Sequence, residues 1–192
     1  IDSQLSLVSS GVLSQDDLDL VAKLSYSLKE TPNALQTDFP SHILVVDDNA
    51  ANTEYLKRKL QSSGHTVSVA DSAETAEALF TESIEVDLIL LDILMPGISG
   101  YEFLGRNEET LQLNNIPVIV VSSLDEQDTV YRCLEAGAQD FVTKPINFTI
   151  LAARINAALE RKHLLDREEE YIESIEAEKE KNESLLLNIL PS

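Results

Sequence analysis

Apolar runs alternate with amphipathic stretches five times between residues 42 and 160. The apolar runs are 42–46, 66–70, 87–91, 116–122 and 140–144. Amphipathic stretches begin near Ala50, Ser72, Ser99 and Asp125, and a last one starts after Pro145. Three of the runs are almost wholly apolar, which is typical of parallel strands covered by helices on both faces. The pattern therefore predicts a doubly wound α/β domain with a five-stranded parallel sheet.

The last amphipathic stretch continues well past the length of an ordinary domain helix. It contains no Pro or Gly between Asn147 and Pro191, and it is rich in Glu, Lys and Leu. These residues favour helix, so we expect a single helix of about forty residues. Two rows of sevenfold-spaced residues run along it: Ala158, Leu165, Ile172, Lys179 and Leu186, beside Glu168, Ile175, Asn182 and Ile189.

The two rows form an apolar seam that charged and amide residues interrupt. A helix this polar cannot bury a core alone, so the seam favours a parallel dimeric coiled coil, in which Asn182 helps to fix the register. Two chains would then pair through roughly residues 150 to 190. The alternative is a solvated helix that is ordered only by its neighbours.

Residues 1–41 differ from the alternating region in pattern and composition. Residues 14–30 form a helix candidate with Ser14 as N-cap and an imperfect apolar side. Pro32 and Pro40 then lie among polar residues, as is typical of a linker. The expected organisation is a helical stub and linker over 1–41, a globular domain over 42–150, and an extended helix over 151–192. Because the chain begins at Ile1 without Met, we expect it to be a fragment of a longer protein.

Composition restricts the class of partner. The net charge of −20 would repel a nucleic-acid backbone or an anionic membrane, so neither is expected as a direct partner. No apolar stretch approaches the roughly 20 residues needed to cross a bilayer, and no signal peptide is evident. We therefore expect a soluble cytoplasmic protein. Cys133 is the single cysteine, which excludes an internal disulfide, and the three histidines, His42, His65 and His163, are expected to be solvated or edge residues.

Polar side chains stand at the carboxyl ends of four predicted strands. Asp47 and Asp48 follow the first strand, Asp92 the third, Ser122 ends the fourth, and Lys144 ends the fifth. In a doubly wound sheet these ends meet at one edge, where ligands bind. Three carboxylates at one edge repel one another, and a hard divalent cation with oxygen ligands, most plausibly Mg²⁺, is the natural compensation.

Asp92 is the best candidate nucleophile among the three acids. It stands alone on the central strand, before a loop with Pro96, Gly97 and Gly100 that leaves space for an incoming phosphoryl group. An aspartate carboxylate can attack phosphorus to give an aspartyl phosphate. Lys144 and Ser122 could then place an ammonium group and a hydroxyl against the phosphoryl oxygens.

The segments VVDDN, LLDILMPGISG, VVSS and DFVTKP together resemble the receiver domain of two-component response regulators, over about residues 42 to 160. The resemblance implies a flavodoxin-like sheet of order 2-1-3-4-5 and a histidine kinase or phosphotransfer protein as phosphoryl donor. It also implies a cis peptide between Lys144 and Pro145. The implied site residues are Asp92 as phosphoacceptor, Asp47, Asp48, Asp92 and the backbone carbonyl of Leu94 as Mg²⁺ ligands, Lys144 and Ser122 against the phosphoryl group, and Phe141 as the switch aromatic.

Three functions agree with these residues. The first is a non-enzymatic phosphorylation switch that the last helix reports onward. The second is a phosphohydrolase with an aspartate nucleophile, although such enzymes typically need a second Asp two residues later, where this chain has Leu94. The third is an interaction module that never accepts phosphate, which the complete set of acids, hydroxyl and lysine disfavours.

The last segment of the sequence bears on which output domain the long helix would control. The segment NESLLLNILPS resembles the helix that leads into class III adenylate or guanylate cyclase domains. The resemblance implies a cyclase downstream, with active sites formed between two chains and a coiled coil as the mechanical link. A serine phosphatase or a diguanylate cyclase attached by a similar helix remains an alternative.

Overall fold

The computed structural model describes residues 40–81, 85–123 and 127–189, with side chains in the last helix described as far as Lys181. The helix expected over 14–30 and most of the linker lie outside these residues. The described elements, in chain order, are β1 (His42–Val46), α3 (Ala50–Ser62), β2 (Thr66–Ala70), α4 (Ala73–Thr81), β3 (Leu88–Asp92), α5 (Gly100–Leu113), β4 (Val118–Ser122), α6 (Gln127–Glu135), β5 (Asp140–Thr143) and α7 (Phe148–Ile189).

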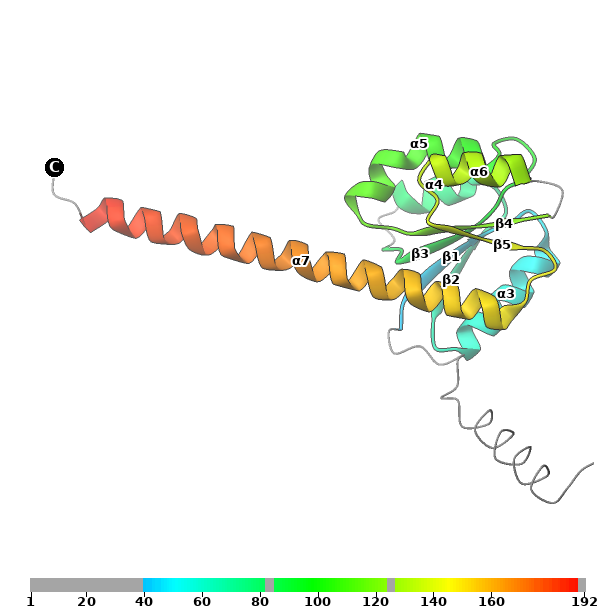
Figure 1. Cartoon of the computed structure of the whole chain (residues 1–192), viewed down its shortest axis with the longest axis horizontal. Helices are drawn as coiled ribbons and strands as arrows, with labels where there is room; N and C mark the ends of the chain where they lie inside the picture. The colour runs from blue at the N-terminus through cyan, green and yellow to red at the C-terminus, as the bar shows by residue number, and fades with distance from the viewer. Residues whose placement is uncertain (1–39, 82–84, 124–126, 190–192) are drawn as a thin grey trace, which may run out of the picture. The chain divides into compact units, whose positions relative to one another are not determined.

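The five strands form one parallel sheet in the order β2-β1-β3-β4-β5 (Figure 1). This confirms the flavodoxin-like order that the resemblance implied. In the pairing of β3 with β4, Asp92 lies opposite Val121, and in the pairing of β4 with β5, Ser122 lies opposite Thr143. The carboxyl ends of the strands therefore meet at one edge, as the strand pattern predicted.

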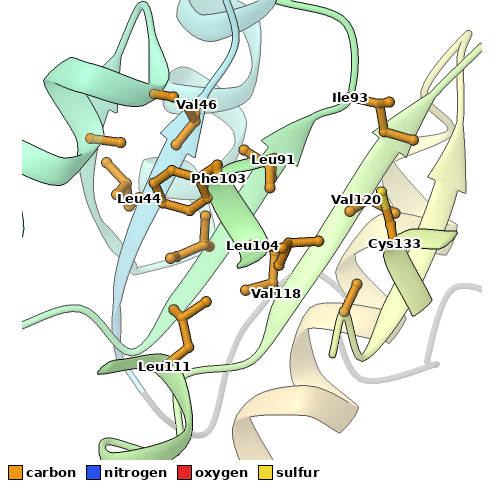
Figure 2. Close-up of a cluster of buried hydrophobic side chains, with 14 of the residues drawn as sticks. Leu44, Val46, Leu91, Ile93, Phe103, Leu104, Leu111, Val118, Val120 and Cys133 are labelled. Carbon is orange, nitrogen blue, oxygen red and sulfur yellow. The ribbon is translucent and has the colours of Figure 1, made fainter. Parts of the chain in front are cut away.

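Two apolar layers cover the sheet. Helices α4, α5 and α6 pack on one face, where Phe103 and Leu104 of α5 and Cys133 of α6 meet side chains of β1, β3 and β4 (Figure 2). Helices α3 and α7 pack on the other face, where Leu56 and Leu60 meet Leu151, Ile155 and neighbouring residues. Burial on both faces explains why β3 and β4 are apolar along almost their whole length.

Local sequence fixes the starts of two helices near the strand ends. Ser99 caps α5, and the Glu102 carboxylate accepts a hydrogen bond from the Ser99 backbone N–H, so both halves of a capping box are present. Asn49 caps α3 by accepting a hydrogen bond from the Ala51 backbone N–H. Asn49 follows the end of β1 and Ser99 follows the loop after β3, so the caps start α3 and α5 beside the carboxyl edge of the sheet.

Helix α7 runs for 42 residues, which confirms the expected length. Its first part, including Leu151, Ile155 and Leu159, is buried against the sheet, whereas every residue from Arg167 to Lys181 is exposed. Ala158, the first position of the expected seam, is also buried in this core. The seam expected from Ala158 onward is thus wrong at its start, because the sheet already covers that residue.

His65 also differs from expectation. Its side chain is 6% exposed, in the turn between α3 and β2, so it is a buried residue and not a solvated one. The buried state follows from tertiary packing that the isolated sequence pattern does not show. Among the described helices, none combines the length and apolar character needed to span a membrane.

Candidate functional site

Three carboxylates converge at the carboxyl edge of the sheet. Asp47 and Asp48 follow β1, and Asp92 ends β3, with one carboxylate oxygen of each within 4.8 Å of the others. Asp47 and Asp92 are only 3% and 5% exposed, whereas Asp48 faces solvent. Like charges held this close in a largely buried site raise one another's free energy, so the site needs cationic partners.

Lys144 supplies one such partner from the end of β5. Its Nζ donates to Asp92 Oδ2 at 2.8 Å and lies 3.5 Å from Asp47 Oδ2. The Lys144 backbone N–H donates to the carbonyl of Ser122 at 2.7 Å, and the peptide bond to Pro145 is cis, as the resemblance implied. One ammonium group against three carboxylates still leaves the site with an excess of negative charge.

Two asparagines that the sequence reasoning missed hold Asp47 in place. The backbone N–H of Asn49 donates to Asp47 Oδ1 at 2.8 Å, and the Asn52 amide donates to Asp47 Oδ2 at 3.0 Å. Asn52 lies in the first turn of α3, so its amide reaches back to the strand end that precedes the helix. The available signal was the side-chain amide of Asn52, five positions after the first aspartate in the segment DDNAAN, whereas the contact of Asn49 uses only its backbone N–H.

The pKa values of Asp92 and Lys144 reflect two opposing effects, burial and the pairing of the two groups. Burial raises the pKa of Asp92, and the hydrogen bond and charge of Lys144 act against this rise. Burial alone would lower the pKa of Lys144, but the hydrogen bond to Asp92 and the charges of Asp92 and Asp47 outweigh it, so that pKa is raised. Lys144 therefore remains a cation at neutral pH and can neutralise anionic groups at this edge.

Ser122 presents a hydroxyl without a partner. Its side chain is 0% exposed, and its Oγ makes no hydrogen bond with any described residue. A buried hydroxyl that loses water without gaining a partner costs about 1–3 kcal/mol. Ser122 follows Val121, the residue that pairs with Asp92, so an anionic ligand at Asp92 is the natural group to satisfy it.

The loop after Asp92 is shaped by close backbone contacts. A Cβ atom on Gly100 would lie 2.4 Å from the carbonyl oxygen of Asp92, so only glycine fits there without a shift. The Gly100 N–H donates to the Ile93 carbonyl at 3.0 Å, which anchors the start of α5 against the end of β3. Leu94 donates a backbone hydrogen bond to the Asp92 carboxylate, and its side chain is 61% exposed.

Phe141, the expected switch aromatic, lies on β5 with its ring partly buried against the core formed by α4, α5 and α6. The guanidinium of Arg154 on α7 lies 5.9 Å from the centre of this ring and also pairs with Asp140. The ring therefore lies near a charged group of α7 rather than wholly inside the sheet layers.

These residues fit a hard divalent cation. Three carboxylates within reach of one another, two of them buried and only partly neutralised by Lys144, form an oxygen donor set of the kind that Mg²⁺ prefers. The structure thus brings together Asp47, Asp48, Asp92 and Lys144 as predicted, and it places Ser122 on the strand beside Asp92.

Comparisons with known proteins agree with this arrangement. The family model of the response regulator receiver domain matches residues 43–156. The rice protein "Two-component response regulator ORR6" is 39% identical over 107 residues, which are 55% of this chain and 63% of that protein. "Response regulator PleD" of Caulobacter vibrioides is 36% identical over 126 residues, which are 66% of this chain and 28% of that protein. The chain thus spans less than two thirds of each.

The solved structure of a Rhodopirellula baltica protein named adenylate cyclase superposes with a TM-score of 0.63 at 25% sequence identity, and the match covers 70% of this chain and 98% of that one. The family match covers more than half of the chain, and the sheet order and the cluster of acids are those that the resemblance implied. The chain therefore belongs to the response regulator receiver domain family.

Proposed function

We propose that this chain is a phosphorylation switch in which Asp92 accepts a phosphoryl group from a histidine kinase or a phosphotransfer protein. Receiver domains act as regulatory phosphoreceivers rather than enzymes, and those two classes of protein are their partners. The observation that carries the proposal is the meeting of Asp92 with Asp47, Asp48 and the ammonium of Lys144 at one sheet edge.

In the proposed step, a carboxylate oxygen of Asp92 attacks the phosphorus of a phosphohistidine. A P–O bond to Asp92 forms while the P–N bond breaks, and the imidazole nitrogen keeps the electron pair. Lys144 already contacts Asp92, so its ammonium is placed to meet a phosphoryl oxygen. The unpartnered hydroxyl of Ser122 would donate to another oxygen, which would satisfy a group that is otherwise buried without a partner.

Asp47, Asp48, Asp92 and the backbone carbonyl of Leu94 are the proposed ligands of Mg²⁺. Receiver domains generally bind this ion at an acidic pocket. When bound, Mg²⁺ would neutralise charge on the carboxylates and on the phosphoryl oxygens. Asn49 and Asn52 would keep Asp47 oriented by their hydrogen bonds, and they are positioning residues in this proposal.

Ser122 and Phe141 are the proposed switch residues. When the Ser122 hydroxyl turns toward the phosphoryl group, Phe141 would turn inward from its partly buried position. Because the ring contacts Arg154 of α7, the change would alter a contact of the output helix. Phe141 lacks the hydroxyl of the Tyr that is frequent at this position, so the proposed movement depends on ring packing alone.

The exposed part of α7 is the proposed route to the output. Leu165, Ile172 and Ile175 are 38%, 48% and 48% exposed, and a second copy of the chain would cover them in a parallel coiled coil. We propose an adenylate or guanylate cyclase as the output, supported by the likeness to the Rhodopirellula protein named adenylate cyclase. A diguanylate cyclase or a serine phosphatase is the alternative output.

The test is phosphoryl labelling with radioactive acetyl phosphate or a phosphorylated histidine kinase. The wild-type chain should gain label only with Mg²⁺ present, and Asp92→Asn should gain none. Removing Asp47 and Asp48 together, as Asp→Asn changes, should abolish Mg²⁺-dependent labelling while circular dichroism stays native. Asp128→Asn on α6, an exposed acid outside the site, is the matched control. Labelling of Asp92→Asn at the wild-type rate would overturn the proposal.

Nothing in the site favours the phosphohydrolase alternative. The position two residues after Asp92, where such enzymes typically carry a general acid, holds the apolar and exposed Leu94. The phosphoaspartate of this chain should therefore hydrolyse, but the chain should not turn over phosphate esters continuously. A continuous phosphate-release assay measures such turnover.

A further inference from the structure

A buried charge on α7 lies outside the site described so far. Lys162 is 8% exposed, and its Nζ donates to the carbonyl of Asn114 at 2.9 Å. The same ammonium pairs with Asp166, one turn further along α7, at 3.0 Å. Lysine is rarely buried unless it is paired, so these contacts are a specific arrangement rather than a solvated surface pair.

The partner of Lys162 is the end of α5. Asn114 is the residue that caps α5, and carbonyls at a helix end lack partners within the helix. A cation there also interacts favourably with the helix dipole. Asn115, at φ +49°, adds a hydrogen bond from its amide to Asp166 Oδ1 at 3.4 Å. We call Lys162, Asp166, Asn114 and Asn115 the polar joint.

Two cavities flank the polar joint. One, of about 320 Å³, is lined by residues of α5 and by Arg161 and Leu165 of α7. The other, of about 510 Å³, is lined by Lys162 and Asp166 together with Val86 and other residues. The apolar packing of α7 on the sheet reaches Leu159, so the polar joint is the last close contact before the exposed stretch. The hydrogen bond of Lys162 to Asn114 therefore ties α7 to the end of α5 at a point where open space borders the helix.

Helix α5 connects the polar joint with the edge that carries Asp92. It starts at Gly100, whose Cα approaches the Asp92 backbone so closely that a side chain would clash, and it ends at Leu113, directly before Asn114. The helix lies across one face of the sheet without interruption (Figure 1). A continuous helix is a rigid element that can carry a displacement from one end to the other.

We propose that Lys162 is a positioning residue that couples the direction of α7 to the C-terminal end of α5. A displacement of α5 at Asp92 then reaches α7 through the polar joint, in addition to any change at Phe141. The static half of this proposal, that Lys162 sets the direction of α7, stands on the contacts above. The phosphorylation-dependent half rests on the proposed function of Asp92.

The test measures the distance between α3 and α7 by pulsed electron paramagnetic resonance. Spin labels are placed at Glu54→Cys and Glu176→Cys, both exposed, in the full chain, while the native Cys133 is 0% exposed and stays unlabelled. Labelled chain is diluted with excess unlabelled chain so that only distances within one chain are seen. Lys162→Met should shift or broaden the distance distribution. Lys162→Arg, which keeps the charge, should give the wild-type distribution. Lys181→Met, on the exposed part of α7, is the matched control.

The second arm adds beryllofluoride with Mg²⁺ as a mimic of the phosphoryl group. The wild-type distance should shift, and Lys162→Met should lose the shift while its Asp92 labelling stays within about twofold, because Lys162 does not touch the site. A Lys162→Met distribution equal to that of the wild type overturns the positioning role. If the wild type neither binds beryllofluoride nor gains label, the proposed function fails, and the first arm still decides the static half. Should Lys162→Met not fold, Asp166→Asn replaces it in both arms.

Discussion

At the scale of single residues, Gly100 and Gly105 of α5 offer a matched pair. Gly100→Ala would place a methyl group 2.4 Å from the Asp92 carbonyl oxygen, whereas a methyl group on Gly105 meets nothing within 4 Å. We expect Gly100→Ala to lower the free energy of unfolding by about 1–3 kcal/mol, as overpacking does. Gly105→Ala should raise it by about 0.5–1 kcal/mol through helix propensity. Urea unfolding measures both, and equal effects would contradict the contact.

His65 makes a second residue-scale prediction, on pH. Burial lowers its pKa from the ordinary value of 6.5, partly opposed by a hydrogen bond to the Ser41 backbone and by the charge of Asp87. The unfolded chain therefore binds this proton more readily than the folded one. The stability that neutral His65 contributes is full above pH 6.5 and is lost as pH falls toward the folded pKa, by at most about 1.4 kcal/mol per pH unit.

His65→Gln tests that sign, because it keeps a polar side chain and removes the titration. Urea unfolding between about pH 7.5 and pH 5.5 should show a smaller loss of stability in the variant than in the wild type. An unchanged pH dependence would mean that other groups account for it.

At the scale of elements, the proposed pairing of two chains would depend on the exposed part of α7. Ile175 lies in the proposed seam and is 48% exposed, and Ala177 lies on the same exposed stretch outside both seam rows. Ile175→Glu should weaken the proposed dimer by at least about tenfold, since it removes an apolar side chain that the dimer would bury and adds repulsion between equal charges. Ala177→Glu, which adds the same charge, is the control. Sedimentation equilibrium of the full chain measures both, and an equal effect of the two changes would exclude this seam.

The elements also show which features a sequence pattern contains. Apolar runs and amphipathic stretches predicted five parallel strands and five helices, because burial on both faces forces nearly continuous apolar strands, and the resemblance implied the strand order. The fourth apolar run began at residue 116, whereas β4 begins at Val118, since Pro117 has no N–H for the ladder. The polar joint was not predictable: Lys162 is one charge among many in its segment, and its partner Asn114 is 48 residues away. Likewise, strand ends predicted Asp47, Asp92 and Lys144 together, but not the backbone N–H of Asn49 and the side-chain amide of Asn52 that hold Asp47.

At the scale of the whole molecule, the acidic cluster adds local repulsion to a chain whose net charge is −20. A cation that binds only the folded state stabilises it by mass action, by about 1.4 kcal/mol at ten times its dissociation constant. We therefore expect Mg²⁺ to raise the thermal unfolding midpoint more than NaCl at equal ionic strength, because NaCl only screens the long-range field.

Asp48→Asn removes one carboxylate of the cluster, and Asp48 is exposed, so the change disturbs no core packing. In the absence of Mg²⁺ this variant should be as stable as the wild type or more stable, and the increment specific to Mg²⁺ should disappear. Differential scanning calorimetry measures both effects. An equal response of the wild type and Asp48→Asn to Mg²⁺ would show that the ion acts on the general charge of the chain and not at the strand ends.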